Sequence, residues 1–397
     1  MVSFATRPAR ILRMPWWLAV TIVFIAGRVI STAMLIWFAD HQLANDWTGA
    51  HPNFGDFSSI WDGRWYNLIA ENGYPTILPH DAEGHVQQNS WAFLPLYPAL
   101  CKLFMVLTGL DWNTVAISVS VIAAFGATLI IYKLFAHFLQ VQQAFFAIIL
   151  FSVAPVAPIY QVAYAESLQL LLIATALLLL VRRQYLWIIP VAILLGFTRP
   201  GALALALTLG LHGIFRYVKG RRAGFPMRER WKLIAATFAS LVAGFAWAGI
   251  AGLVTGVPSA YVQTELSWRA AYVGWVELVP FTPWLQAAQY WFSAPMSYFV
   301  LAGALALFAA VIFAPASRRL GLDMRLWMFS YSVYLLAVFF PQSSTFRLLA
   351  PMFPALGMFA APKSKLYRIV LVIVFLALQW YWIAFCWAIS DYDWSPP

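Results

Sequence analysis

Long apolar runs dominate this chain of 397 residues and limit what it can fold into. A helix needs about 20 predominantly apolar residues to span the hydrocarbon core of a bilayer. The runs, starting with 16–38, are rich in Leu, Ala, Val and Ile and lack the alternation of strands. Only 10% of the residues are charged, against about 25% in soluble domains. The sequence therefore predicts an all-α polytopic membrane protein and excludes a soluble globule.

The first apolar run predicts a permanent anchor rather than a cleaved signal peptide. It begins at Pro15, its apolar core is long, and no small-residue cleavage site follows it. The two cysteines, Cys101 and Cys386, are too few for a metal cluster or a disulfide framework. They could pair on the outer side, but small buried thiols are the simpler interpretation.

Basic residues predict which side of the membrane each loop occupies. Arg7, Arg10 and Arg13 precede the first run, so the positive-inside rule places the N-terminus in the cytoplasm. Further basic clusters lie at 182–183, 216–232, 318–325 and 363–368, whereas the first loop is acidic. The net charge of +10 then follows from topology and contact with anionic lipid head groups, and nucleic-acid binding is not expected.

Eleven spans fit between these basic clusters, and the C-terminus then lies outside. They cover approximately 16–38, 114–135, 142–160, 164–181, 186–199, 201–217, 233–255, 298–314, 326–340, 346–361 and 368–389. If the segment 91–107 crossed the membrane, every later basic cluster would lie on the outer side. We therefore expect it to form a helix at the outer interface, with its start broken by Pro95 and Pro98. We expect one membrane domain over 1–397, with a first outer loop at 39–113 and a second at 256–297.

Ionisable side chains close to a membrane are costly and are therefore candidates for function. On the predicted outer side these are Asp62, Arg64, Glu166, Arg199, Arg269 and Arg347, with His80 and His85 in the first loop. Arg199 and Arg347 stand in short turns, where each guanidinium could hold a lipid phosphate through two hydrogen bonds or snorkel to the interface. Arg28, inside the first span, could pair with an acid but is more simply explained by packing against carbonyls.

Two of the acids have a structural explanation beside the functional one. Glu166 begins a span, where the helix dipole stabilises a carboxylate, and it could equally orient one of the arginines. Asp62 follows two serines and could cap a short interfacial helix over 60–71.

The second outer loop is rich in aromatic residues that are typical of interfacial anchors, although aromatic rings also stack on sugars. These residues are Trp268, Tyr272, Trp275, Trp284, Tyr290 and Trp291.

Several short stretches resemble one known family. The first loop contains Trp61-Asp62-Gly63-Arg64-Trp65-Tyr66, Ile69-Ala70, Gly73-Tyr74 and Ala92-Phe93-Leu94-Pro95-Leu96-Tyr97-Pro98. Later stretches are Tyr164-Ala165-Glu166-Ser167-Leu168, Thr198-Arg199-Pro200-Gly201 and Phe346-Arg347-Leu348-Leu349-Ala350-Pro351. Together they resemble, in the same order, the PIG-V family of glycosylphosphatidylinositol mannosyltransferases and their bacterial relatives, which have the GT-C fold. Ala165 and Pro200 depart from the more polar residues expected at their positions.

The resemblance implies a GT-C-like bundle of about 11 transmembrane helices with two interfacial helices in the first loop. It also implies a glycosyltransferase, of inverting type in our hypothesis, that moves mannose from polyprenyl-phosphate-mannose to a glycolipid, lipoglycan or protein acceptor at the extracytoplasmic face. The compact loops favour a bacterial cell membrane. The family's loop aspartate corresponds to Asp62, the expected general base.

We expect Arg199 and Arg347 to bind the donor phosphate in this mechanism. The expected supporting residues are Glu166, Arg64, Trp61, Tyr66 and Tyr97.

We expect neither a cofactor nor a metal, because a lipid-linked sugar is already activated and the sequence has no Walker A motif or Rossmann-type glycine loop. Asp391 and Asp393 resemble a metal-binding carboxylate pair, but we interpret them as part of a solvated tail. A transporter or lipid flippase is the main alternative and would place polar residues near the membrane midplane. A structural subunit of an envelope complex is another alternative, and it would leave the stretch around Asp62 unexplained.

Overall fold

The computed structural model describes residues 14–389, apart from the side chains of 220–223. The basic residues Arg7, Arg10 and Arg13 and the pair Asp391 and Asp393 lie outside the described residues. Within 14–389 the chain is largely helical and contains no β-strand, only an isolated bridge between His80 and Val86. The prediction of an all-α protein is confirmed.

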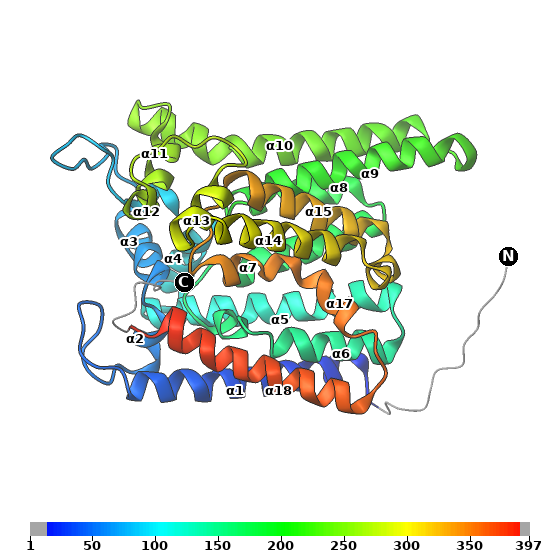
Figure 1. Cartoon of the computed structure of the whole chain (residues 1–397), viewed down its shortest axis with the longest axis horizontal. Helices are drawn as coiled ribbons and strands as arrows, with labels where there is room; N and C mark the ends of the chain where they lie inside the picture. Colours follow the sequence, from blue (N-terminus) through cyan, green and yellow to red (C-terminus); the bar gives the residue numbers. More distant parts are fainter. Residues whose placement is uncertain (1–13, 390–397) are drawn as a thin grey trace.

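Long helices lie side by side along the molecule (Figure 1). In the first half these are α1 (Trp16–Asp40), α5 (Trp112–Phe138), α6 (Val141–Ser152), α7 (Glu166–Val181), α8 (Tyr185–Gly196) and α9 (Ala202–Ala223). In the second half they are α10 (Met227–Thr255), α14 (Met296–Phe313), α15 (Gly321–Val338) and α18 (Lys365–Trp382). α5 packs along α7, α8 and α9 each pack on α10, and α15 packs on α9.

Five of the described helices are long and apolar enough to cross a membrane: α1, α5, α10, α14 and α18 with its continuation to Trp387. Large apolar side chains remain exposed on these helices, for example Phe299 and Leu307 on α14 and Ile373 on α18. Water disfavours such a surface, whereas lipid tails solvate it. The chain is an integral membrane protein, and the number of eleven spans remains a prediction.

Some of the predicted spans are shorter or broken in the structure. α6 and α8 have 12 residues each, which at a rise of about 1.5 Å per residue is too short for the bilayer core. The predicted span 142–160 consists of α6 and a 3-10 helix, η2 (Ala157–Gln161). The predicted span 346–361 is divided into α16 (Thr345–Leu348), the 3-10 helix η4 (Ala350–Ala355) and α17 (Leu356–Phe359). Pro351 and Pro354 lie in that segment, where they remove backbone donors that a continuous helix needs.

The two long loops form short helices at one end of the bundle. The first contains α2 (Phe54–Ser58), α3 (Asp62–Asn72) and α4 (Leu96–Thr108), and the second contains α11 (Ala260–Ser267), α12 (Ala270–Val273) and α13 (Pro283–Trp291). α3 agrees with the helix expected over 60–71, and α4 with most of 91–107. Figure 1 shows these helices at the left and the basic α9–α10 connection at the right. Which end faces the cytoplasm remains a prediction.

Arg28 and both cysteines lie in the interior. The Arg28 guanidinium donates to the carbonyls of Ala157 at 2.6 Å and Ser152 at 2.9 Å and to the Gln161 side chain at 3.0 Å. These contacts agree with packing against carbonyls, the simpler of the two explanations given for Arg28. Cys101 and Cys386 are both buried.

Candidate active site

Asp62 is the first residue of α3, and its neighbours fix the start of that helix. Trp61, at the N-cap, has a φ of 57°, an uncommon backbone conformation for a residue with a large side chain. Its indole N–H donates to the carbonyl of Trp387, 2.8 Å away, in the π-helical segment η5 (Ile383–Trp387) that continues α18. The backbone N–H of Asp62 donates to the Tyr164 hydroxyl at 3.1 Å. The loop before α7 and the end of α18 thus hold Asp62 in place.

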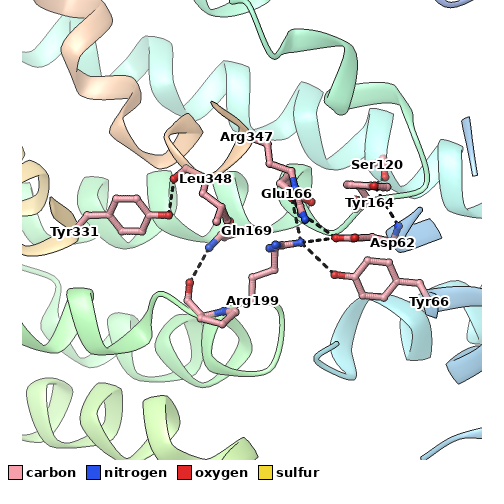
Figure 2. A network of polar contacts seen from close by, with 11 residues as sticks. Asp62, Tyr66, Ser120, Tyr164, Glu166, Gln169, Arg199, Tyr331, Arg347 and Leu348 are labelled. Atoms are coloured by element: carbon pink, nitrogen blue, oxygen red, sulfur yellow. Dashed lines mark hydrogen bonds and ion pairs between the residues drawn. The ribbon is translucent and has the colours of Figure 1, made fainter. Parts of the chain in front are cut away.

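Two arginines and two carboxylates meet at this point (Figure 2). The Arg347 guanidinium lies 2.9 Å from the Asp62 carboxylate and 2.5 Å from that of Glu166. The Arg199 guanidinium lies 3.5 Å and 3.0 Å from the same two carboxylates. None of the four side chains is more than 12% exposed. Each carboxylate is shared by both arginines, so the charges of this cluster balance.

Short structural elements place these side chains. Glu166 is the first residue of α7, where the helix dipole stabilises its charge. Its side chain also pairs with both arginines, so the two explanations given for it from the sequence are compatible. Arg199 lies in the turn between α8 and α9, and Arg347 lies in α16. The Tyr331 hydroxyl of α15 donates to the neighbouring Leu348 carbonyl at 2.8 Å and ties α16 to α15.

Burial and charge act on Asp62 in opposite directions. Burial raises the pKa of the Asp62 carboxyl, while Arg347 and Arg199 oppose the rise. A carboxylate with a raised pKa is a stronger base than an ordinary aspartate. Among the described residues, the Nε–H groups of Arg199 and Arg347 have no hydrogen-bond acceptor. The two arginines therefore retain N–H donors that the carboxylates of Asp62 and Glu166 do not use.

The cluster forms part of the wall of a cavity of about 440 Å³. Asp62, Arg199 and Arg347 line it, whereas Glu166 lies behind them. The other side of the cavity is apolar and includes Leu203 of α9 and Phe245 of α10. The site can therefore bind a molecule that has both a charged and an apolar part.

Further polar residues line the cavity and were not singled out as site residues from the sequence, among them Tyr261 and Glu265 of α11 and Tyr331 and Tyr334 of α15. Their helical spacing is the signal that could have found them, since residues three and four apart share a helix face.

Arg269, which the sequence placed on the outer side, also lines the cavity. Its guanidinium donates to the Val276 carbonyl at 2.8 Å. No carboxylate of residues 14–389 lies within ion-pair distance of it, in contrast to Arg199 and Arg347. Arg269 therefore brings a positive charge that no adjacent acid balances. Trp268 lines the cavity too, rather than facing only the membrane interface.

The predicted supporting residues have different surroundings. Tyr66 lines the cavity and accepts a hydrogen bond from Arg199 at 3.4 Å. Tyr97 is buried behind Tyr66, with ring centroids 5.1 Å apart. Trp61 supports the backbone before Asp62. Arg64 is exposed and lies over the Trp47 ring at 4.8 Å, so it does not join the cluster.

The two loop histidines lie outside the cavity. His80 forms the bridge to Val86, and His85 stacks on Trp275 with ring centroids 4.6 Å apart. Within residues 14–389, no group of three or more His, Cys, Asp or Glu side chains is arranged to hold a metal ion.

Comparison with solved structures finds similarity to the oligosaccharyltransferase of Archaeoglobus fulgidus. For its complex with zinc and sulfate the TM-score is 0.47 at 13% identity, over 93% of this chain and 54% of that one. For the form tethered to an acceptor peptide with the NVT sequon, the TM-score is 0.41 at 14% identity, over 94% of this chain and 55% of that one. The chain thus spans about half the length of these proteins. No protein-family model and no curated protein matches the chain.

Proposed function

We propose that the chain is a GT-C glycosyltransferase that moves mannose from polyprenyl-phosphate-mannose to a glycolipid or lipoglycan at the extracytoplasmic membrane face. The observation that carries this proposal is the position of Asp62 and two arginines in one cavity with an apolar wall. Such a cavity suits an anionic lipid. The choice of mannose and of a polyprenyl carrier rests on the resemblance of the first loop to the PIG-V family.

The carrier phosphate belongs beside the arginines. Arginine binds phosphate through short, charge-assisted hydrogen bonds. Arg199 and Arg347 already share two carboxylates, so an incoming phosphate competes with Asp62 and Glu166 for their donors. Arg269 adds an uncompensated positive charge to the same cavity. These groups would stabilise the negative charge that develops on the departing phosphate.

Asp62 is the base in the proposed reaction. An acceptor hydroxyl attacks the anomeric carbon while its proton passes to the Asp62 carboxylate. A new carbon–oxygen bond forms on one face of the sugar as the bond to the carrier phosphate breaks on the other, so the configuration inverts. The phosphate leaves with the bonding electrons, and the reaction needs no cofactor. Glu166 is a positioning residue that holds both arginines.

Transport of a lipid across the membrane fits this arrangement less well. The charged cluster comes from α3, the start of α7, the α8–α9 turn and α16 (Figure 2), and α3 lies at one end of the bundle (Figure 1). A transport path needs polar groups near the midplane that both faces can reach. A structural subunit has no need of a cavity lined by buried charges.

Sugar transfer by the purified chain in lipid vesicles tests the proposed class. One reaction receives tritium-labelled mannosyl polyprenyl phosphate, and a matched reaction receives labelled GDP-mannose. We expect label to pass to membrane lipids from the lipid-linked donor alone. Transfer from GDP-mannose would contradict a lipid-linked donor, and absence of transfer from both mannosyl and glucosyl polyprenyl phosphate would contradict the enzyme class.

A further inference from the structure

We propose that Glu265, together with Tyr261 and Tyr334, forms the subsite that binds the hydroxyl groups of the transferred sugar. This inference rests on the proposed function, because the sugar in question is the one attached to the lipid carrier. All three residues line the cavity that also contains Asp62. They belong to α11 and α15, whereas the arginine cluster is built on other elements.

α11 turns one side toward the cavity. Tyr261 and Glu265 both line it, and their spacing of four residues places them on one face of the helix. Trp268 and Arg269, which follow the end of α11, line the cavity as well. Across the cavity, α15 contributes Tyr334 together with other side chains spaced three or four residues apart. Two helices from distant parts of the sequence thus present hydroxyl and carboxylate groups to the same space.

The Glu265 carboxylate is open to the cavity and is available to a ligand. Its side chain is accessible from the cavity although protein surrounds it, and no Lys or Arg of the described residues lies within ion-pair distance of it. The Tyr261 side chain, one helical turn away, lies beside the carboxylate, and Arg199 and Asp62 are close enough to influence its charge. The surrounding protein raises the pKa of Glu265 to about 7, with Arg199 opposing the rise. A carboxylate in this setting retains acceptor sites for hydroxyl donors.

A hexose is the ligand that matches this wall of the cavity. Sugar hydroxyls donate to carboxylates in short, charge-assisted hydrogen bonds. Trp268 offers a fixed apolar surface beside Glu265, since its ring packs edge-on against Trp65 at 5.6 Å and Phe93 at 5.7 Å. A phosphate would be repelled by Glu265 and attracted by the arginines. The cavity therefore offers two distinct positions: one beside Glu265 for the neutral sugar of the donor, and one beside the arginines for its phosphate.

Binding of carriers with and without a sugar tests this subsite without requiring transfer. The affinities of farnesyl phosphate and mannosyl farnesyl phosphate are measured for the full chain in detergent. We expect wild type to bind the sugar-bearing carrier more tightly. In Glu265→Gln that preference should shrink roughly tenfold or more, because a hydrogen bond to a charged group is lost. Affinity for farnesyl phosphate should be kept or rise, because the variant removes a negative charge that repels phosphate, and retained binding also shows that the variant is folded.

Two companion variants sharpen the test. Tyr334→Phe removes only a hydroxyl and should weaken the preference less than Glu265→Gln. Glu277→Gln is the matched control, because Glu277 is exposed in the same loop and does not line the cavity. It should bind both carriers as wild type does.

Deoxy sugars identify the hydroxyl that contacts Glu265. Removing that hydroxyl should weaken binding to wild type but have little further effect on Glu265→Gln, because the two changes remove the same hydrogen bond. A Glu265→Gln variant that keeps the full sugar preference, or deoxy effects that are additive at every position, would overturn the subsite. If Glu265→Gln instead bound the acceptor more weakly but kept its preference for the sugar-bearing carrier, Glu265 would belong to the acceptor site and the proposed subsite would be overturned as well. If wild type binds neither carrier, the proposed function itself fails.

Discussion

Asp62 and Glu166 contact the same two arginines but differ in their access to substrate. Asp62 lines the cavity, whereas the Glu166 side chain is 1% exposed and lies behind the arginines. In the proposed reaction, the two arginines therefore have two roles. They orient the Asp62 carboxylate toward an acceptor hydroxyl, and Glu166 holds them in place for the carrier phosphate.

Glu265 predicts a pH dependence of stability that its amide variant lacks. Burial raises its pKa from the ordinary 4.5 to about 7 in the folded protein. The folded state then binds the proton more tightly than the unfolded state, so the free energy of unfolding falls as pH rises through this window and levels off above it. Relative to Glu265→Gln, the melting temperature of wild type should fall between about pH 4.5 and about pH 7. Thermal unfolding in detergent measures this, and parallel profiles for the two proteins would contradict it.

α8 and α10 approach each other backbone to backbone at Gly196. A Cβ atom at this position would lie 2.5 Å from the Ala243 carbonyl oxygen, and a backbone carbonyl cannot rotate out of the way. Gly196 also lines the cavity, so the close contact of these helices shapes the apolar wall. Gly196→Ala should lower the free energy of unfolding by about 1–3 kcal/mol.

The matched control for this contact lies on α10. At Gly249 a Cβ atom would meet nothing within 4 Å, so Gly249→Ala should leave stability unchanged or raise it by up to about 1 kcal/mol. Unfolding of both variants in detergent provides the comparison. Equal stability of the two would show that the α8–α10 contact does not need a glycine.

At the scale of the whole molecule, the separation of charge predicts an orientation. Glu83, in the first loop, should face outward, and Lys363, before α18, should face the cytoplasm. A membrane-impermeant maleimide should label Glu83→Cys in intact cells and Lys363→Cys only after permeabilisation. The native cysteines are buried and should contribute little background. The reverse labelling pattern would contradict the orientation.

Much of the cavity's charged wall could be predicted because charge is scarce in this chain. Asp62, Glu166, Arg199 and Arg347 are conspicuous between apolar runs, and the structure brings all four together. Glu265 was missed because it lies in an aromatic loop, where composition favours interfacial anchors. Its place beside the cavity depends on how α11 packs relative to α15, which the sequence of neither segment reveals.

The helices were predicted best where apolar runs are uninterrupted. α1 and α5 agree closely with the expected 16–38 and 114–135. The breaks within 142–160 and 346–361 were missed because hydropathy averages over a window and gives proline little weight. Prolines such as Pro351 nevertheless interrupt backbone hydrogen bonding there, and Arg347 lies in the short helix α16 that precedes the break.

The most direct test of the account separates carrier binding from sugar transfer in Asp62→Asn. The amide cannot take the acceptor's proton, and it also removes a charge that competes with phosphate for Arg199 and Arg347. We therefore predict that transfer falls by about 10²–10⁴ while polyprenyl phosphate binds at least as tightly as to wild type. Asp46→Asn, at an exposed position of the same loop, should behave as wild type. Transfer at the wild-type rate by Asp62→Asn would contradict the account, because Asp62 would then not be the base.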